Sequence, residues 1–460
     1  MAAEATLPLA PSGIKPEECV SGSLDWWTQP FVETSVEAAY FTDHLPQVPL
    51  TESSNSIVFS IPSCDDFLDL CDSYIQISLK IKNADNSNLA AWAPAAPAAA
   101  ANSVGFVNLP ASSIFSACNF RLNDELLSDS FQTYQYQSYL QTILNYNSDA
   151  RKSRLQLLGF YEDIDVTAND AHDTAESSGF KTRANLTSLS HEATFISNIF
   201  HGMWSQARYL PPLIPFALEW IKAPAAFCLQ SNAANPTFKY EITKMKLFLR
   251  KIKIRASQKL QLEQNLQKNL ALFPLRFSVA KPLFIDRHEK QVSFENVFQG
   301  RAIPAYCVIG FVEQTKYRGT QGTNPYEFSH FSLTSLKMSI DGESYPSPFP
   351  FQPNYTSGTA PNHTREYLAL FDNQIKVDSG SFITYEMFKS NGYCLYVINF
   401  GREVTQSRDH VVPKRVGSCR LDVSFDPAST NEALTLMLYS ESDEIIGIDG
   451  NRKIYRDFHL

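Results

Sequence analysis

The most distinctive hydrophobic pattern in the chain lies between residues 294 and 346. A short apolar run at residues 308–312 is followed by glycines and an Asn-Pro pair, and then by residues 331–340, in which apolar and polar side chains nearly alternate. A period of two is typical of a half-buried β-strand. Asp341 and Gly342 end this segment, and Asp-Gly readily takes positive φ at both central positions of a type I′ turn. The pattern therefore predicts strands joined by a tight hairpin.

The same order of parts occurs about half a chain earlier. Residues 120–127 and 338–345 each run through an apolar residue, a polar one, an aliphatic one, a two-residue turn and Glu, and the first copy has Asn123-Asp124 as its turn. An amphipathic segment with a Tyr-Leu pair follows each copy, at Tyr139-Leu140 and at Tyr367-Leu368. Two ordered matches at similar spacing predict a duplicated β domain.

Strand-like patterns fill most of both halves. In residues 74–82, aliphatic side chains alternate with polar ones in a clean period of two. Further strands are predicted at residues 56–61, 194–200, 216–221, 227–229, 242–255, 275–279, 283–285, 392–400, 419–425 and 433–439. Each half thus offers roughly eight short strands, the number found in a jelly-roll sandwich.

A change to helical spacing separates the two halves. Leu262, Leu266 and Leu270 fall on one helical face. Ser257 can cap this helix, and Pro274 is expected to stop it. Two other short helices are predicted at residues 134–145 and 148–158.

These patterns predict an all-β fold class, with two tandem eight-stranded jelly-roll sandwiches joined by a short helix and carrying long inserted loops. The predicted organisation is an extended N-terminal arm at 1–50, a first jelly roll at 51–256, a linker helix at 257–272, a second jelly roll at 273–452 and a C-terminal tail at 453–460.

Composition supports the β-rich class and excludes some functions. The 460 residues include 32 Phe and 20 Tyr, which favour pleated, half-buried surfaces. The 39 basic and 48 acidic residues leave a net charge of −9, which does not suit a nucleic-acid-binding protein. Eight scattered cysteines without a Cys-x-x-Cys pair indicate reduced thiols. The sequence shows neither a signal peptide nor a membrane span.

Large aromatic side chains indicate that the N-terminal arm docks on a surface. The arm holds six prolines and little periodicity, yet it carries Trp26, Trp27, Phe31, Tyr40 and Phe41. Exposing so many rings to water is costly. We therefore expect the arm to dock on its own domain or on a neighbour, so these five residues are candidate interface residues.

An acidic cluster precedes the alternating strand at residues 74–82. Asp65, Asp66, Asp69 and Asp72 are carboxylates, the ligands that Ca²⁺ prefers. Their spacing does not fit an EF-hand loop, and no glycine lies where such a loop would turn. A solvated or interfacial turn is the favoured interpretation, and a bound cation is the alternative.

One basic run is a candidate contact for phosphates. Its cations alternate with apolar residues and include Lys244, Lys246, Arg250, Lys253 and Arg255. One face of this strand could touch a nucleic-acid backbone. The favoured alternative is a strand whose other face is core and whose cations pair with nearby acids. We expect weak or no direct nucleic-acid binding.

The sequence contains no legible catalytic motif. Its nine histidines show neither a His-x-His nor a His-Glu-x-x-His pattern. Gly-x-Ser-x-Gly, a phosphate-binding glycine loop and a dinucleotide fingerprint are also missing from it. We therefore predict a protein that is not an enzyme, with no catalytic, cofactor-binding or metal-binding residue and no cofactor.

Several short segments taken together resemble one protein family. They are Leu24-Asp25 and residues 34–37, 65–70, 206–210, 296–304, 324–328, 341–342 and 391–393. From residue 20 to about 455 the chain resembles the double jelly-roll major capsid proteins of Maverick/Polinton elements and adintovirus-like DNA viruses, distant relatives of adenovirus hexon. It departs from their pattern in a longer, Ala-rich loop at 92–101 and in Pro-Ser-Cys before Asp65, where relatives tend to have glycine.

The resemblance implies a homotrimer whose six upright sandwiches form a pseudo-hexagonal capsomer of an icosahedral shell around a double-stranded DNA genome. It also implies contacts with neighbouring capsomers, penton proteins and minor capsid proteins. The expected location is the virion capsid, after synthesis in the host cytoplasm and assembly in the nucleus or cytoplasm. Two alternatives stay open: a jelly-roll binding module such as a glycan-binding spike or lectin, with a shallow aromatic groove, and a cupin-like metalloenzyme with a bound metal.

Overall fold

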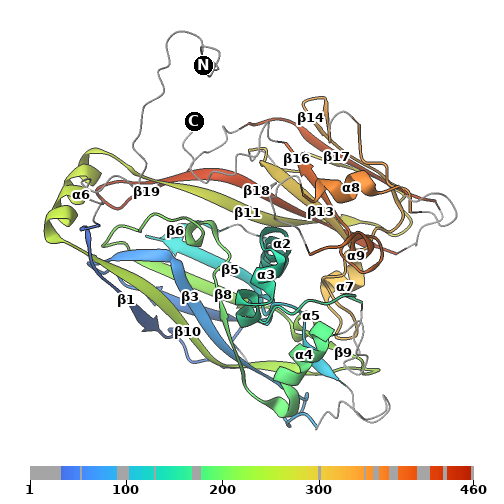
Figure 1. Ribbon diagram of the computed structural model, residues 1–460, viewed down its shortest axis with the longest axis horizontal. Helices are drawn as coiled ribbons and strands as arrows, with labels where there is room; N and C mark the ends of the chain where they lie inside the picture. Colours follow the sequence, from blue (N-terminus) through green and yellow to red (C-terminus); the bar gives the residue numbers. More distant parts are fainter. Residues whose placement is uncertain are drawn as a thin grey trace, which may run out of the picture.

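The computed structural model consists of two β-sandwiches that lie against each other (Figure 1). The first sandwich runs from blue to green in Figure 1, and the second runs from yellow to red. The structure describes residues 33–51, 54–90, 103–128, 131–167, 178–298, 302–346, 349–355, 362–371, 382–400, 415–427 and 432–456.

The first sandwich contains two four-stranded antiparallel sheets. One has the order β1 (Val36–His44), β10 (Lys239–Ile254), β3 (Phe67–Lys82) and β7 (Ala193–Ser197). The other has the order β2 (Ser56–Ile61), β8 (Phe216–Lys222), β5 (Phe115–Leu122) and β6 (Glu125–Leu126). A separate two-stranded ribbon joins β4 (Val104–Phe106) to β9 (Leu229–Ser231).

The second sandwich is built in the same way. One sheet has the path β11 (Ala271–Ile285), β18 (Leu434–Ile448), β13 (Tyr306–Glu313) and β16 (Leu395–Asn399), and β19 (Ile454–Arg456) pairs with β18 beside it. The facing sheet has the order β12 (Gln291–Glu295), β17 (Cys419–Phe425), β14 (Leu333–Ile340) and β15 (Glu343–Tyr345).

The two sandwiches share one connectivity. When the strands of the four-stranded paths are counted in chain order within each half, one sheet reads first, eighth, third, sixth, and the other reads second, seventh, fourth, fifth. Both halves give this same order, which is that of a jelly roll. The predicted fold class is therefore confirmed, and β1 corresponds to β11 as the first strand of each sandwich.

Both predicted hairpin turns are present. Asn123 and Asp124 have φ of 46° and 68° between β5 and β6, and Asp341 and Gly342 have φ of 49° and 90° between β14 and β15. Positive φ at both central positions is the signature of a type I′ turn, whose twist matches that of the paired strands. The short-range turn chemistry was thus sufficient to place both hairpins.

The helices are short and lie mostly between strands. They are α1 (Pro110–Ser113), α2 (Tyr134–Asn145), α3 (Ser148–Arg151), α4 (Ser178–Leu186), α5 (Ala225–Cys228), α6 (Ala256–Lys268), α7 (Gln314–Arg318), α8 (Thr364–Ala369) and α9 (Tyr385–Ser390), with 3₁₀ turns at 154–158, 188–190 and 202–204. The helix predicted at 134–145 is confirmed as α2. The helix predicted at 148–158 is instead the short helix α3 followed by a separate 3₁₀ turn at 154–158. This turn buries Leu155 and Leu158 and is followed by Gly159.

The strand after the linker helix differs from expectation. The two predicted strands at 275–279 and 283–285 form one strand, β11, which includes Pro274 and Pro282. Proline is tolerated there because β11 lies at a sheet edge, where a missing N–H breaks no second ladder. The linker helix α6 accordingly ends at Lys268, and Pro274 does not stop it.

Strands also occur near both ends of the described chain. β1 lies within the predicted N-terminal arm and pairs with β10, and β19 lies within the predicted tail and pairs with β18. The backbone groups of both segments therefore find hydrogen-bond partners inside the sandwiches. Residues 1–32 and 457–460 lie outside the described residues.

Replacing Gly319 with Ala is expected to destabilise the protein. Gly319 has φ of +89°, and an added Cβ would lie 2.8 Å from the backbone of Phe227 in the other sandwich. Strain of this kind costs about 1–3 kcal/mol. Thermal unfolding should show a lower Tm for G319A, whereas the control G322A should match the wild type, because nothing lies within 4 Å of a Cβ at Gly322. Equal melting of the two variants would contradict this account.

Candidate functional site

Helix α2 lies between the two sandwiches (Figure 1), and its tyrosines contact the second one. The ring of Tyr139 stacks on that of Tyr326, with centroids 4.0 Å apart and planes 2° from parallel. The Tyr136 hydroxyl donates to the Pro325 carbonyl at 2.9 Å, and Tyr326 donates to the Gln135 carbonyl at 3.2 Å. Burial raises the pKa of all three tyrosines, so each hydroxyl keeps its proton.

The same helix covers the free edge of β11. Thr133 Oγ1 donates to the Ala280 carbonyl at 2.5 Å, and Gln137 Nε2 donates to Ser278 Oγ at 2.8 Å. Further along, the Arg208 guanidinium donates to the Leu272 carbonyl. These bonds satisfy backbone and side-chain groups of an edge strand that would otherwise be open to another chain.

A buried ion pair braces the same junction from the side of the first sandwich. Arg183 Nη2 lies 2.9 Å from Asp163 Oδ2, and both side chains are at most 5% exposed. Arg183 also donates to the carbonyls of Phe106 and Tyr161. Tyr393 of the second sandwich donates its hydroxyl to the Asp163 carbonyl at 2.7 Å. The Arg183 guanidinium thus has hydrogen-bond partners beyond the carboxylate, which a buried ion pair needs to persist.

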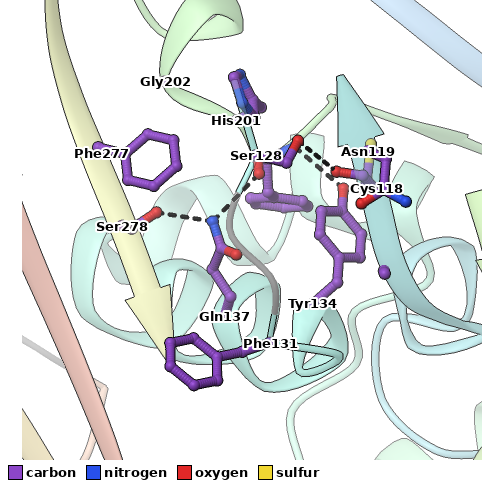
Figure 2. Close-up of a pocket in the computed structure, with 12 residues that line it drawn as sticks. Cys118, Asn119, Ser128, Phe131, Tyr134, Gln137, His201, Gly202, Phe277 and Ser278 are labelled. Atoms are coloured by element: carbon purple, nitrogen blue, oxygen red, sulfur yellow. Dashed lines mark hydrogen bonds between the residues drawn. The ribbon is translucent and has the colours of Figure 1, made fainter. Parts of the chain in front are cut away.

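A small polar cavity lies where β5, α2 and β11 meet (Figure 2). Its volume of about 20 Å³ suits one water molecule and is far below the size of a substrate pocket. Figure 2 shows Gln137 pointing across it to Ser278, with Tyr134 and His201 on the other sides. The cavity belongs to the contact between the sandwiches.

His201 is held beside this cavity as a neutral ring. Its Nδ1 accepts from the Met203 N–H at 3.2 Å, so its Nε2 carries the proton and donates to the Leu127 carbonyl at 3.3 Å. Phe120 and Phe277 pack edge-on against it, at centroid distances of 5.2 and 5.8 Å. Burial lowers the pKa of His201 to about 4.

The predicted basic run lies on β10 and is paired with acids. The cation–carboxylate distances are 3.0 Å for Lys244–Glu192, 2.9 Å for Lys246–Asp43, 3.2 Å for Arg250–Asp69 and 3.5 Å for Lys253–Glu37. Arg255 is exposed just before α6, and its N–H donates to the Ser35 carbonyl. The local pairing supports the structural interpretation of this run over a phosphate-binding face.

The acidic cluster is split between a bend and a strand. Asp65 and Asp66 lie in the bend between β2 and β3, as the favoured interpretation predicted, whereas Asp69 and Asp72 do not lie in a turn. Asp69 and Asp72 lie on β3, because the buried side chains around them extend that strand alongside β10. Both carboxylates pair with Arg250, and burial raises the pKa of Asp69. Asp66 instead accepts from the Tyr40 hydroxyl at 2.6 Å, and Lys259 donates to the Asp65 carbonyl.

Two of the five predicted arm aromatics lie in the described chain. Tyr40 and Phe41, on β1, are 41% and 50% exposed. The Phe41 ring meets Tyr74 of β3 at 5.6 Å. Trp26, Trp27 and Phe31 lie outside the described residues. Among the described residues, neither Tyr40 and Phe41 nor the basic run lies at the junction between the sandwiches.

Sequence reasoning missed the residues that form this junction. The available signal was the spacing of Tyr134, Tyr136 and Tyr139, which points large rings to more than one side of α2. Such a helix is buried on several sides. Nothing in the pattern of the helix could name the partners Ser278 and Tyr326, because they lie more than 130 residues away.

The described residues offer no metal centre. No three side chains of His, Cys, Asp or Glu come together there in a way that could hold an ion. The described cysteines are all free thiols. The helices of the described segments are too short or too polar to span a lipid bilayer.

Comparison with known proteins shows the fold. No family model matches the chain. An uncharacterized protein of Caenorhabditis elegans is 21% identical over 348 residues, which cover 75% of this chain and 79% of that protein. A chain of the Sputnik virophage structure superimposes with a TM-score of 0.63 at 12% identity, covering 99% of this chain and 95% of that one.

Two solved capsid proteins superimpose over nearly their whole length. The mavirus major capsid protein has a TM-score of 0.53 at 9% identity, covering 99% of this chain and 97% of its own. The Faustovirus major capsid protein has a TM-score of 0.53 at 8% identity, covering 91% and 92%. The chain therefore has the double jelly-roll fold of these proteins, as the resemblance in its sequence indicated.

The low pKa of His201 predicts a loss of stability in acid. The native state holds the ring neutral, whereas an unfolded histidine titrates near 6.5. This contribution is complete above about pH 6.5 and falls as the pH drops toward 4, by roughly 3 kcal/mol in all. The difference in Tm between pH 7 and pH 4.5 should shrink in H201Q but not in H191Q, since His191 is exposed. An undiminished difference in H201Q would refute it.

Proposed function

We propose that this chain is a viral major capsid protein that forms homotrimers, and that the trimers tile an icosahedral shell around a double-stranded DNA genome. The observation that carries the proposal is the superposition of both sandwiches, together and almost end to end, on the major capsid proteins of mavirus and Faustovirus. A match to one sandwich alone would support only a jelly-roll module.

The proposed assembly follows from the duplication. Two sandwiches per chain give six in a trimer, arranged as a pseudo-hexagonal capsomer. An obligate interface of this kind commonly buries more than about 2,000 Å². The proposed partners are copies of the chain, neighbouring capsomers, penton proteins and minor capsid proteins, and the proposed location is the virion capsid. In this proposal the chain catalyses no reaction and binds the genome weakly or not at all.

The rigid link between the sandwiches supports this role. Tyr139, Tyr326 and the bonds from α2 to β11 lock one sandwich to the other inside each chain. A subunit of a closed shell needs such a fixed angle, because rotation of one sandwich relative to the other would displace the surfaces that contact neighbouring subunits.

The full-length chain is expected to be a trimer in solution. Light scattering on the purified protein at micromolar concentration should give three times the 51.7 kDa chain mass. Negative-stain images should show pseudo-hexagonal particles. A stable monomer under these conditions would contradict the proposal and favour a binding module such as a lectin.

Removing residues 1–32 is expected to impair shell assembly without unfolding the sandwiches. The deleted arm carries Trp26, Trp27 and Phe31, whereas β1 must be kept because it pairs with β10. The truncated chain should melt at the wild-type temperature but give fewer complete particles by electron microscopy. A variant with only these three rings changed to Ser should reproduce the defect. Normal particle yield from both proteins would refute a role for the arm.

A further inference from the structure

The two equivalent edge strands differ in how their free edges are covered in the described chain. β11 and β1 are each the first strand of a sandwich and each lie at the edge of the corresponding sheet. The β11 edge is covered by α2 and its neighbours, which donate to the carbonyls of Ala280 and Leu272. In the part of the chain that the structure describes, β1 pairs with β10 and with no other strand.

The uncovered strand exposes large apolar side chains. Tyr40 and Phe41 are 41% and 50% exposed, and Leu45, directly after β1, is 67% exposed. Natural proteins protect such edges with a helix, a loop or another chain, since an open edge with apolar side chains invites association.

The strand register shows which part of β1 corresponds to the covered part of β11. β1 begins its pairing at Val36↔Ile254, the last residue of β10, and β11 begins at Ala271↔Ile448, the last residue of β18. When Val36 and Ala271 are each counted as the first position of their strand, Tyr40 and Phe41 lie within one or two positions of the place that Phe277 has in β11. In the same chain Phe277 packs against His201, 5.8 Å between ring centroids. The exposed stretch of β1 is thus the counterpart of a covered stretch of β11.

The second sandwich carries an exposed counterpart of α2. Matching Tyr139-Leu140 to Tyr367-Leu368 aligns α2 with α8. Leu140 is 1% exposed, whereas Leu368 is 63% exposed. Phe349, at 68% exposure, lies beside it, because its carbonyl accepts from Arg365 Nη2 at 2.8 Å. By the same alignment Arg365 takes the place of Gln137, the residue that bonds β11.

We propose that α8 of one copy of this chain covers the β1 edge of a second copy, as α2 covers β11 within one chain. The proposal rests on the proposed function and specifies the surfaces through which its subunits meet. The contact is heterologous, since each copy offers α8 to one neighbour and β1 to the other, and such a contact can close a ring. Arg365 lies on α8, and the carboxylates of Glu37 and Asp43 on β1 stay 42% and 54% exposed beside their lysine partners on β10, so the two surfaces can meet with opposite charges.

Charged substitutions on each surface test the contact. F41E disables β1 and leaves α8 intact, and L368E does the reverse. Each variant alone should be monomeric by light scattering at a concentration where the wild type is trimeric. An equal mixture should form a dimer of one chain of each kind, because that pair retains a single complete contact. L45E serves as a second β1 variant should F41E alter the fold through its contact with Tyr74.

The control is L157E, at a leucine that is 56% exposed on the 3₁₀ turn at 154–158, outside both surfaces. It should stay trimeric, and all variants should melt within a few degrees of the wild type. Trimers of F41E, L45E and L368E, or a mixture that stays monomeric, would overturn the proposed contact while the wild-type trimer stands. A monomeric wild type would instead overturn the proposed function.

Discussion

The structure depends on how the free edges of its sheets are covered. A jelly roll leaves edge strands whose backbone groups must find partners, and an uncovered edge pairs with whatever chain it meets. Here α2 lies along the edge of β11, and Thr133 and Gln137 bond to it directly. Together with the stacked tyrosines, this contact fixes the second sandwich against the first. It turns a duplicated module into a single rigid unit, and it leaves β1 as the counterpart edge without cover in the described chain.

The junction between the sandwiches is polar as well as apolar, and this makes its geometry specific. Stacked tyrosines could slide if only apolar contact held them. The hydroxyls of Tyr136 and Tyr326 each donate to one carbonyl, and this fixes the orientation of both side chains. The neutral ring of His201 and the pair of Asp163 with Arg183 add bonds that are costly to leave half-made. The result is one defined angle between the sandwiches, which a lattice-forming subunit requires and a flexible pair of binding modules does not.

Short-range patterns located much of the fold. The predicted limits of β2, β17 and α2 agree with the structure to the residue, and both hairpins occur at the Asn-Asp and Asp-Gly turns. They did not locate the prolines of β11, because proline stops a strand only where its N–H is needed, and that depends on whether the strand lies at an edge. The sequence predicted that the β10 cations pair with acids, but it did not identify the acids. Their partners include Glu192, just before β7, and Asp43 on β1, both far away in the chain.

The amino-acid sequence by itself determined the period of each segment, the turns and the repetition of one module, because these arise between residues a few positions apart. Only the tertiary structure decided which surfaces meet. Asp69 became part of a strand and an ion pair through Arg250, 181 residues away, and Tyr139 found its partner in the other sandwich. Such choices depend on shape and on burial from water across the whole molecule, and no local pattern encodes them.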